Sequence, residues 1–406
     1  MATVRQGSSG GWSPATVQQT STGGGHRRER HDVPPRPAVA AVPSPRFTLV
    51  QWVLLQIAAA AVVCGLAARH GWQVVGIAIG ALLTLVSIVR VQRRWLYQTL
   101  TSRLRLRSRK RAQRHFTGLA SLAGPYQVVD VAGSGGTPIA VIRAGTTWAL
   151  PLEFRQDSVF NDDAGVPLGG LTSLLKIEDV SIASVRLLSF VTPAVVPASA
   201  PAGPAPLLAR GASRHCILTL DTILAASALA DRGGSDAAIT QILRRCAMRA
   251  QEVLGSGRVS LHTLDEAAVH RILDSCLGPP GPQARPADAA TVESATGIRI
   301  GGKYSTTVVV GGAAGTALGR LTDLLPYLPG RVAAVTLVLM PDRHRGGARS
   351  TLLVRVSAPA DRAAGNLGTR LGKMLSRAGL LVQRVDGEQA ELLRASTPLG
   401  LTEGTL

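Results

Sequence analysis

The sequence predicts an α+β protein in which two adjacent membrane helices precede a larger region made of two similar α/β halves. Three observations predict this arrangement. They are two long uncharged segments near the N-terminus, a basic segment directly after them, and an order of strands and helices that occurs twice in the remaining chain. The length of 406 residues allows two or three domains.

The positive charge of the chain is concentrated at its N-terminal end. The formal net charge is +19, and residues 1–129 contain 17 Lys and Arg against two acidic residues, Glu29 and Asp32. Residues 1–46 are rich in Gly, Ser, Thr, Pro and Arg, a composition that predicts a disordered basic tail. We therefore expect an anionic partner to bind the first third of the chain.

Two uncharged runs predict transmembrane helices. Residues 47–68 contain no charged side chain over 22 positions, and residues 71–89 contain none over 19. As a helix, either run nearly matches a hydrocarbon core of about 30 Å. Because the runs are separated only by Arg69 and His70, we expect a tight transmembrane hairpin. The alternative is a buried helical hairpin of a soluble protein, for which such neighbouring runs are less typical.

Arginine counts predict how the hairpin is oriented. Six Arg precede the first run and ten Lys or Arg follow the second, so we expect a plasma-membrane (inner-membrane) protein with both termini in the cytoplasm. Residues 90–116 are predicted to form a basic juxtamembrane helix against anionic lipid headgroups, where each basic residue contributes about 1 kcal/mol. The predicted membrane-interface residues are Arg90, Arg93, Arg94, Trp95, Arg103, Arg105, Arg107, Arg109, Lys110, Arg111 and Arg114.

The remaining chain divides into two halves, residues 125–277 and 293–400, joined by a Pro- and Gly-rich linker at 278–292. Each half reads strand, helix, strand, strand, helix, strand, and each contains an LTxLL helix motif. This order predicts two tandem ferredoxin-like (βαββαβ) units, and chance similarity between Ala- and Leu-rich segments is the alternative. A Pro/Ala loop at 193–209 interrupts the first half.

An additional helix is predicted at the end of the first half. It begins with "TLDE", which we interpret as a capping box in which Thr263 and Glu266 satisfy each other's backbone N–H groups. This helix is a candidate tie between the two halves.

The sequence contains no clear nucleotide-binding, metal-binding or catalytic motif. "GIRIGGKY" (297–304) resembles a phosphate-binding loop, but Tyr304 stands where a hydroxyl ligand of Mg²⁺ is needed and a strand follows, so we expect a hairpin turn with Lys303 solvated. The eight His residues form no metal-binding spacing. We predict no catalytic, cofactor-binding or metal-binding residue. The four cysteines, predicted to be reduced and buried, are Cys64, Cys216, Cys246 and Cys276.

The sequence resembles the EccE family, the E component of the type VII (ESX) secretion membrane complex, over roughly residues 47–400. The resemblance rests on the paired membrane segments, on "RRWLYQTLTSRLRLRSRKR", "GTTWALPLEF" and "IEDVSIASVRLLSFVTPAVVPASAPA", and on "RVDGEQAELLRASTPLG" near the C-terminus. It implies a non-enzymatic subunit, anchored by two helices, that packs against the EccB, EccC and EccD components. EccC is the ATPase of that complex, and the resemblance brings no catalytic residue.

Two other functions remain open at this point. One is a membrane-bound enzyme acting on a cell-envelope precursor, with a site between the two halves. The other is a membrane tether for DNA, although no nucleic acid is expected because the chain shows no aromatic-rich RNA platform or zinc finger.

Overall fold

A computed structural model describes residues 49–67, 70–91, 94–96, 104, 106–108, 125–133, 138–156, 168–192, 211–255, 259–277, 291–300, 302–312, 314–342, 347–360 and 366–399. The predicted basic tail, the Pro/Ala loop and most of the linker lie outside these residues. The helices are α1 (Leu49–Ala67), α2 (His70–Ile88), α5 (Leu168–Ser173), α6 (Ala226–Ala230), α7 (Asp236–Leu254), α8 (Glu266–Leu277), α9 (Ala314–Leu324), the 3-10 helix η5 (Leu325–Tyr327), α10 (Leu367–Arg377) and α11 (Gln389–Ala395).

The strands are β1 (Arg90–Val91), β2 (Arg94–Trp95), β3 (Gln127–Ala132), β4 (Pro138–Ala144), β5 (Thr147–Gln156), β6 (Lys176–Ile177), β7 (Val180–Ser181), β8 (Ser184–Thr192), β9 (Gly211–Asp221), β10 (Val259–Thr263), β11 (Val292–Glu293), β12 (Ile298–Ile300), β13 (Lys303–Gly311), β14 (Val332–Pro341), β15 (Ala348–Pro359) and β16 (Leu381–Arg384).

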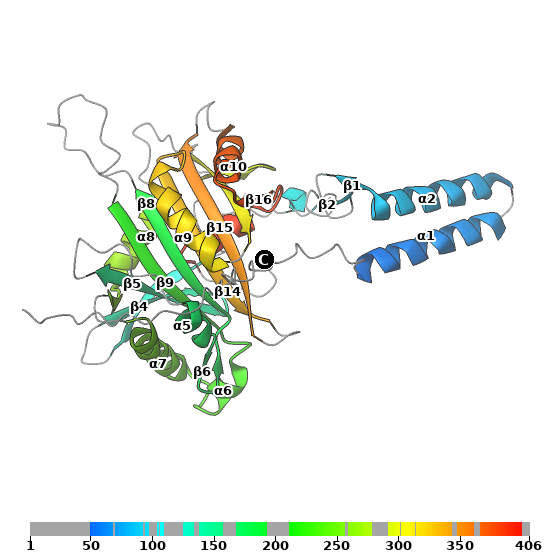
Figure 1. The fold of residues 1–406 in the computed structure, drawn as a ribbon. Helices are drawn as coiled ribbons and strands as arrows, with labels where there is room; N and C mark the ends of the chain where they lie inside the picture. The colour runs from blue at the N-terminus through cyan, green and yellow to red at the C-terminus, as the bar shows by residue number, and fades with distance from the viewer. Residues whose placement is uncertain are drawn as a thin grey trace, which may run out of the picture. The chain divides into compact units, whose positions relative to one another are not determined.

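The N-terminal elements form a helical hairpin, in which α1 and α2 lie side by side (Figure 1). When only the described residues are counted, none of the helices is long and apolar enough to cross a membrane. The helix predicted over 90–116 does not begin as expected, because β1 and β2 pair antiparallel directly after α2, with Arg90 opposite Trp95. Farther along this segment, the described residues 104 and 106–108 are helical.

The globular region is built on one sheet of twelve strands, which confirms the α+β prediction. The main path runs β11-β12-β13-β15-β14-β8-β9-β5-β4-β3, while β10 also pairs with β5 and β16 also pairs with β13. All the described pairs are antiparallel. The two halves of the chain meet where β8 pairs with β14, in a register that places Leu188 opposite Thr336.

The two halves of this sheet have the same internal strand order. It is β10-β5-β9-β8 in the first half and β16-β13-β15-β14 in the second. Each half also begins with an additional hairpin, β3–β4 or β11–β12, that pairs with the start of its first long strand. Each then ends with a helix, α8 or α11. The two halves therefore share a strand order, and each has a further hairpin and a further helix.

Helices cover both faces of the sheet. On the first face, α5, α7, α9 and α10 pack on the sheet in one large hydrophobic core, and Figure 1 shows α9 lying across β14 and β15. On the second face, α8 packs over the centre and α11 packs over the strands of the second half. Because both faces are covered, the central strands are apolar almost without interruption: all eight residues from Val332 to Leu339 are buried.

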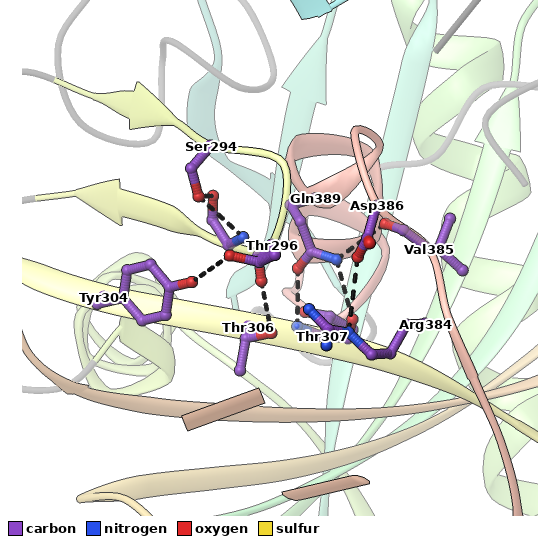
Figure 2. Close-up of polar contacts among 10 residues, drawn as sticks. Ser294, Thr296, Tyr304, Thr306, Thr307, Arg384, Val385, Asp386 and Gln389 are labelled. Carbon is purple, nitrogen blue, oxygen red and sulfur yellow. Dashed lines mark hydrogen bonds and ion pairs between the residues drawn. The ribbon is translucent and has the colours of Figure 1, made fainter. Parts of the chain in front are cut away.

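Figure 2 shows how a side chain fills a gap beside β13. The neighbouring strands β12 and β16 pair with the beginning and the end of β13, but neither reaches Thr307. There the Gln389 side chain accepts a hydrogen bond from the Thr307 backbone N–H through Oε1 (2.9 Å), and its Nε2 donates to the Thr307 carbonyl oxygen (3.1 Å) and to that of Val385 (3.0 Å). The amide thus takes the place of one residue of a neighbouring strand.

Three local expectations are corrected by the structure. The cap of α8 is Asp265, whose Oδ1 accepts a hydrogen bond from the Ala268 backbone N–H at 2.6 Å, so the capping box was placed on the wrong residues. The "GIRIGGKY" segment forms the expected hairpin turn between β12 and β13, but Lys303 is half-buried and not solvated. All four cysteines are free, and Cys64 is exposed on α1 whereas the other three are buried.

We predict that Gln389→Ala destabilises the globular region by about 2 to 3 kcal/mol, because it leaves the buried N–H and C=O groups of Thr307 without partners. Urea unfolding of the solubilised full chain measures the change. Gln383→Ala removes an exposed amide on β16 and is the matched control, expected to stay within about 0.5 kcal/mol. Equal effects of the two substitutions would contradict this role of Gln389.

A second prediction concerns pH. His215 is buried on β9, stacked on Phe190, and burial lowers its pKa to about 4, while Glu153 raises it slightly. Because the unfolded chain binds a proton at this site below about pH 6.5 and the folded chain does not, the group removes stability as the pH falls from about 6.5 to 4. We expect His215→Leu to remove about 2 kcal/mol of the stability lost between pH 7 and 5, as measured by urea unfolding at both pH values. An unchanged loss in the variant would refute the assignment.

Candidate functional site

Small residues bring the two helices of the hairpin into close contact. A Cβ atom added to Gly76 would lie 2.5 Å from the Gly65 Cα and 2.9 Å from the Ala61 carbonyl oxygen, and one added to Gly80 would lie 2.3 Å from a methyl group of Val62. No larger side chain fits at these contacts without moving a backbone. Close approach through Gly and Ala is the packing mode of helices in membranes, where burial of apolar side chains does not drive association.

Two polar side chains of the hairpin are buried, whereas Gln56 and many large apolar side chains are exposed. Gln51 and Ser87 are fully buried, and the Gln51 Nε2 donates to the Ser87 carbonyl oxygen at 3.1 Å. The hydroxyls of Thr84 and Ser87 donate to backbone carbonyls one turn earlier, as is common in membrane helices. The exposed large side chains of the hairpin are Trp52, Val53, Ile57, Val63, Leu66, Val74, Val75, Ile77, Ile79, Leu82, Leu85 and Ile88.

The predicted membrane-interface residues are only partly described. Arg90, Arg94 and Trp95 lie in the short strands β1 and β2, and Arg107 is exposed on a helical segment. The other predicted interface residues lie outside the described residues: Arg93, Arg103, Arg105, Arg109, Lys110, Arg111 and Arg114. The structure thus places the first basic residues directly after α2, at the end of the hairpin.

Two buried arginines on the second face of the sheet join the halves. Arg186 on β8 donates through Nη1 to the Thr397 carbonyl oxygen at 2.7 Å and through Nη2 to the Pro398 carbonyl oxygen at 3.4 Å. Both acceptors follow α11 of the other half. The remaining described partner of Arg186 is the Thr219 hydroxyl, which lies 3.3 Å from Nη2.

Arg355 makes the reciprocal contact. It lies on β15 of the second half, and its Nη1 donates to the Cys276 carbonyl oxygen at 2.5 Å, in the last turn of α8 from the first half. Its Nη2 lies 3.4 Å from the Ser396 carbonyl oxygen. The last carbonyls of a helix have no partner within the helix and carry partial negative charge, so a guanidinium group satisfies and stabilises them. Arg355 of the second half therefore binds the last turn of α8, and Arg186 of the first half binds the residues that follow α11.

The two guanidinium groups are held without a described carboxylate partner. Burial lowers the pKa of Arg186 to about 9, helped by the nearby charge of Arg394, and burial also lowers the pKa of Arg355. Both side chains still carry a charge at neutral pH. The Nε atoms of both have no hydrogen-bond partner among the described residues. This environment suits a structural contact between the halves, since fully buried groups cannot reach a substrate.

One group of titratable side chains spans the two halves. Burial lowers the pKa of Lys303 to about 8, an effect that Asp274 on α8 opposes, and burial together with Asp274 raises the pKa of Tyr126. Among the described residues that these interactions join, Asp274 is the one carboxylate. Within the described part of the chain, no three His, Cys, Asp or Glu side chains gather where they could hold a metal ion.

Fold and geometry together define a helical hairpin attached in sequence to an α+β region whose two halves share one strand order. Comparison with known proteins does not extend this description. No family model matches the chain. No curated protein is significantly similar to it.

We predict that Gly76→Leu separates α1 from α2, because a leucine side chain cannot fit against Gly65 and Ala61. The distance between spin labels on Ile57→Cys and Leu82→Cys, in a Cys64→Ser background, should increase and broaden. Gly71→Leu is the control, since a Cβ at Gly71 meets no atom within 4 Å and should leave the distance unchanged. An unaltered distance in Gly76→Leu would show that the helices do not pack in this way.

We also predict that Arg355→Met loosens the end of α8 by removing the donor to the Cys276 carbonyl. Burial raises the pKa of the Cys276 thiol to about 11, although Arg355 lowers it, so this thiol is expected to react slowly in the native protein and to become accessible only when the end of α8 opens. A buried acceptor left unpaired costs about 1 to 3 kcal/mol, so labelling of Cys276 by a thiol reagent should become about fivefold to 150-fold faster.

The internal controls for this experiment are Cys216 and Cys246, which are buried away from the Arg355 contact. If their labelling accelerates as much as that of Cys276, Arg355 supports the whole fold and does not hold α8 in particular.

Proposed function

We propose that this chain is a non-catalytic, membrane-anchored structural subunit of a type VII (ESX) protein secretion complex. The hairpin of α1 and α2 crosses the plasma membrane, both termini lie in the cytoplasm, and the globular region docks on neighbouring subunits of the EccB, EccC and EccD type. The two halves of the globular region are a pair of ferredoxin-like units that carry an added hairpin and an added helix.

The arrangement of side chains in the hairpin carries the anchoring part of this proposal. A hairpin that buries Gln51 and Ser87 and exposes twelve large apolar side chains has the reverse of the distribution that water favours. Helices α1 and α2 have 19 residues each, and the uncharged runs of sequence that contain them extend over residues 47–68 and 71–89. The proposal takes these full runs as the spans, with the basic residues that follow them on anionic headgroups.

The structural role is supported by the way in which the globular region is built. Its two buried arginines, Arg186 and Arg355, donate to carbonyl oxygens in or just after the last turn of a helix, which is a structural role. The strand order shared by the halves fits a duplicated scaffold, whose surfaces are available for other subunits. The choice of a secretion complex rests on the resemblance of the sequence to the EccE family.

Extraction and co-purification test this proposal. We expect the full chain to remain in the membrane pellet in high salt and in alkaline carbonate, and to be released by a mild detergent together with other membrane subunits. A variant with Asp at Ile57, Val63, Ile79 and Leu82, all exposed on the hairpin, should lose membrane association. Release of the intact wild-type chain by salt alone would exclude membrane anchoring, and its purification alone in every mild detergent would exclude the role as a subunit.

A further inference from the structure

Helix α10 presents a basic face that its counterpart in the first half of the fold lacks. Arg370, Lys373 and Arg377 are exposed along one side of α10, at the spacing that lines up side chains on a helix, while Leu371 and Leu375 on the opposite side are buried. None of these three cations takes part in a described ion pair or hydrogen bond. The sequence from residue 362 to residue 385 contains no Asp or Glu.

The equivalent helix α7 provides an internal comparison. It also has exposed arginines, but Arg245 pairs with Glu178 at 2.9 Å and Arg249 pairs with Glu252 at 2.9 Å, and Asp236 at its start lies 3.6 Å from Arg143. The same position of the fold is therefore neutralised in the first half and left basic in the second. The acidic residues on the elements around α10 are Asp323 on α9, and Asp386 and Glu388 after β16, where Asp386 lies 3.6 Å from Arg384.

The length of chain between the hairpin and the globular region limits where this face can be. Only 29 residues, 96–124, connect β2 to the start of the globular region, and such a segment spans at most about 100 Å even when fully extended. If the hairpin is in a bilayer, the basic face of α10 is always within reach of the same bilayer. An anionic lipid surface is thus present at a high effective concentration, whereas a soluble acidic partner has to be recruited.

We propose that the exposed cations of α10 bind the anionic lipid headgroups of the membrane that holds the hairpin, so that the globular region lies against the bilayer through its second half. The proposal rests on the proposed membrane anchoring. The contact is electrostatic, because the apolar side of α10 is packed on the sheet and cannot enter the bilayer. It adds a second attachment to the one made by the basic segment after α2.

The test uses the full chain in lipid nanodiscs, with a spin label on Asn366→Cys in a Cys64→Ser background. Asn366 is exposed at the start of α10, and its side chain makes no capping hydrogen bond. Collision of the label with a water-soluble nickel reagent is measured in discs of phosphatidylcholine alone and in discs rich in phosphatidylglycerol. We expect the anionic lipid to lower the collision rate severalfold, and high salt to restore it.

Charge-removal variants decide whether α10 itself makes the contact. Each basic residue near an anionic surface favours the bound state about fivefold, so R370Q/K373Q/R377Q should shift the equilibrium about a hundredfold towards the free state and abolish the lipid effect. The matched control R244Q/R245Q/R249Q removes three charges from α7 and should leave the lipid effect intact. All six substituted side chains are exposed, and a thermal melt of each variant checks that folding is unchanged.

The outcomes separate this inference from the anchoring on which it rests. Failure of the chain to enter discs of either lipid would overturn the anchoring, and the inference with it. A chain that enters both discs, with a label equally accessible in each, would overturn the inference alone. Protection that appears only with an added protein, and equally in neutral discs, would assign the basic face to an acidic protein partner and also overturn the lipid contact.

Discussion

The antiparallel pairing of β8 with β14 is the contact on which the rest of the globular region depends. It joins two four-stranded units into one sheet and places both strands where helices cover the two faces. A strand in that position has no solvated side, so a polar group on it is costly to bury without an internal partner. Among the described residues, the hydroxyls of Ser184 on β8 and Thr336 on β14 are buried without one. The same pairing brings α8 and α11 of opposite halves onto the second face, close to Arg186 and Arg355.

Along one edge, the first long strand of each half has a position that neither neighbouring strand on that edge reaches, and the residue at that position differs between the halves. The pairs Ala144–Thr147 and Ile300–Lys303 close the equivalent hairpin turns, so Pro151 in β5 corresponds to Thr307 in β13. At this position the neighbouring strands leave a gap in both halves. Proline has no N–H group and needs no partner there, whereas threonine has one. In the second half the Gln389 side chain supplies the missing partner.

The buried arginines show a similar exchange between the halves. Arg186 lies opposite Ile217, and Arg355 lies opposite Ala334, and these two cross-strand pairs occupy equivalent positions. Arg186 is on β8, the second long strand of its half, and Arg355 is on β15, the third long strand of its half. Each guanidinium group nevertheless reaches a carbonyl oxygen at or just after the end of a helix. The position of the charge over the sheet has therefore been kept, while the strand that carries it has changed.

The order of strands and helices could be predicted from the sequence because the periods of apolar residues are local. Contacts between distant residues could not: Gln389 lies 82 positions from Thr307, and Arg186 lies 211 from Thr397. A glutamine at the start of a helix and an arginine in an apolar strand look ordinary until the strands are aligned. The cap of α8 was misplaced for a different reason, since "TLDE" offers two cap residues and only the observed start at Glu266 selects Asp265.

The hairpin and the globular region follow opposite rules of burial, and this contrast bears most directly on function. In the globular region, apolar side chains fill the core and buried arginines are bonded to carbonyls, as water requires. In the hairpin, glycines and a buried glutamine lie inside and large apolar side chains lie outside. This contrast is the reason for our proposal that the hairpin lies in a bilayer while the globular region lies in water. Under that proposal the bilayer also provides an anionic surface for the basic residues after α2 and on α10.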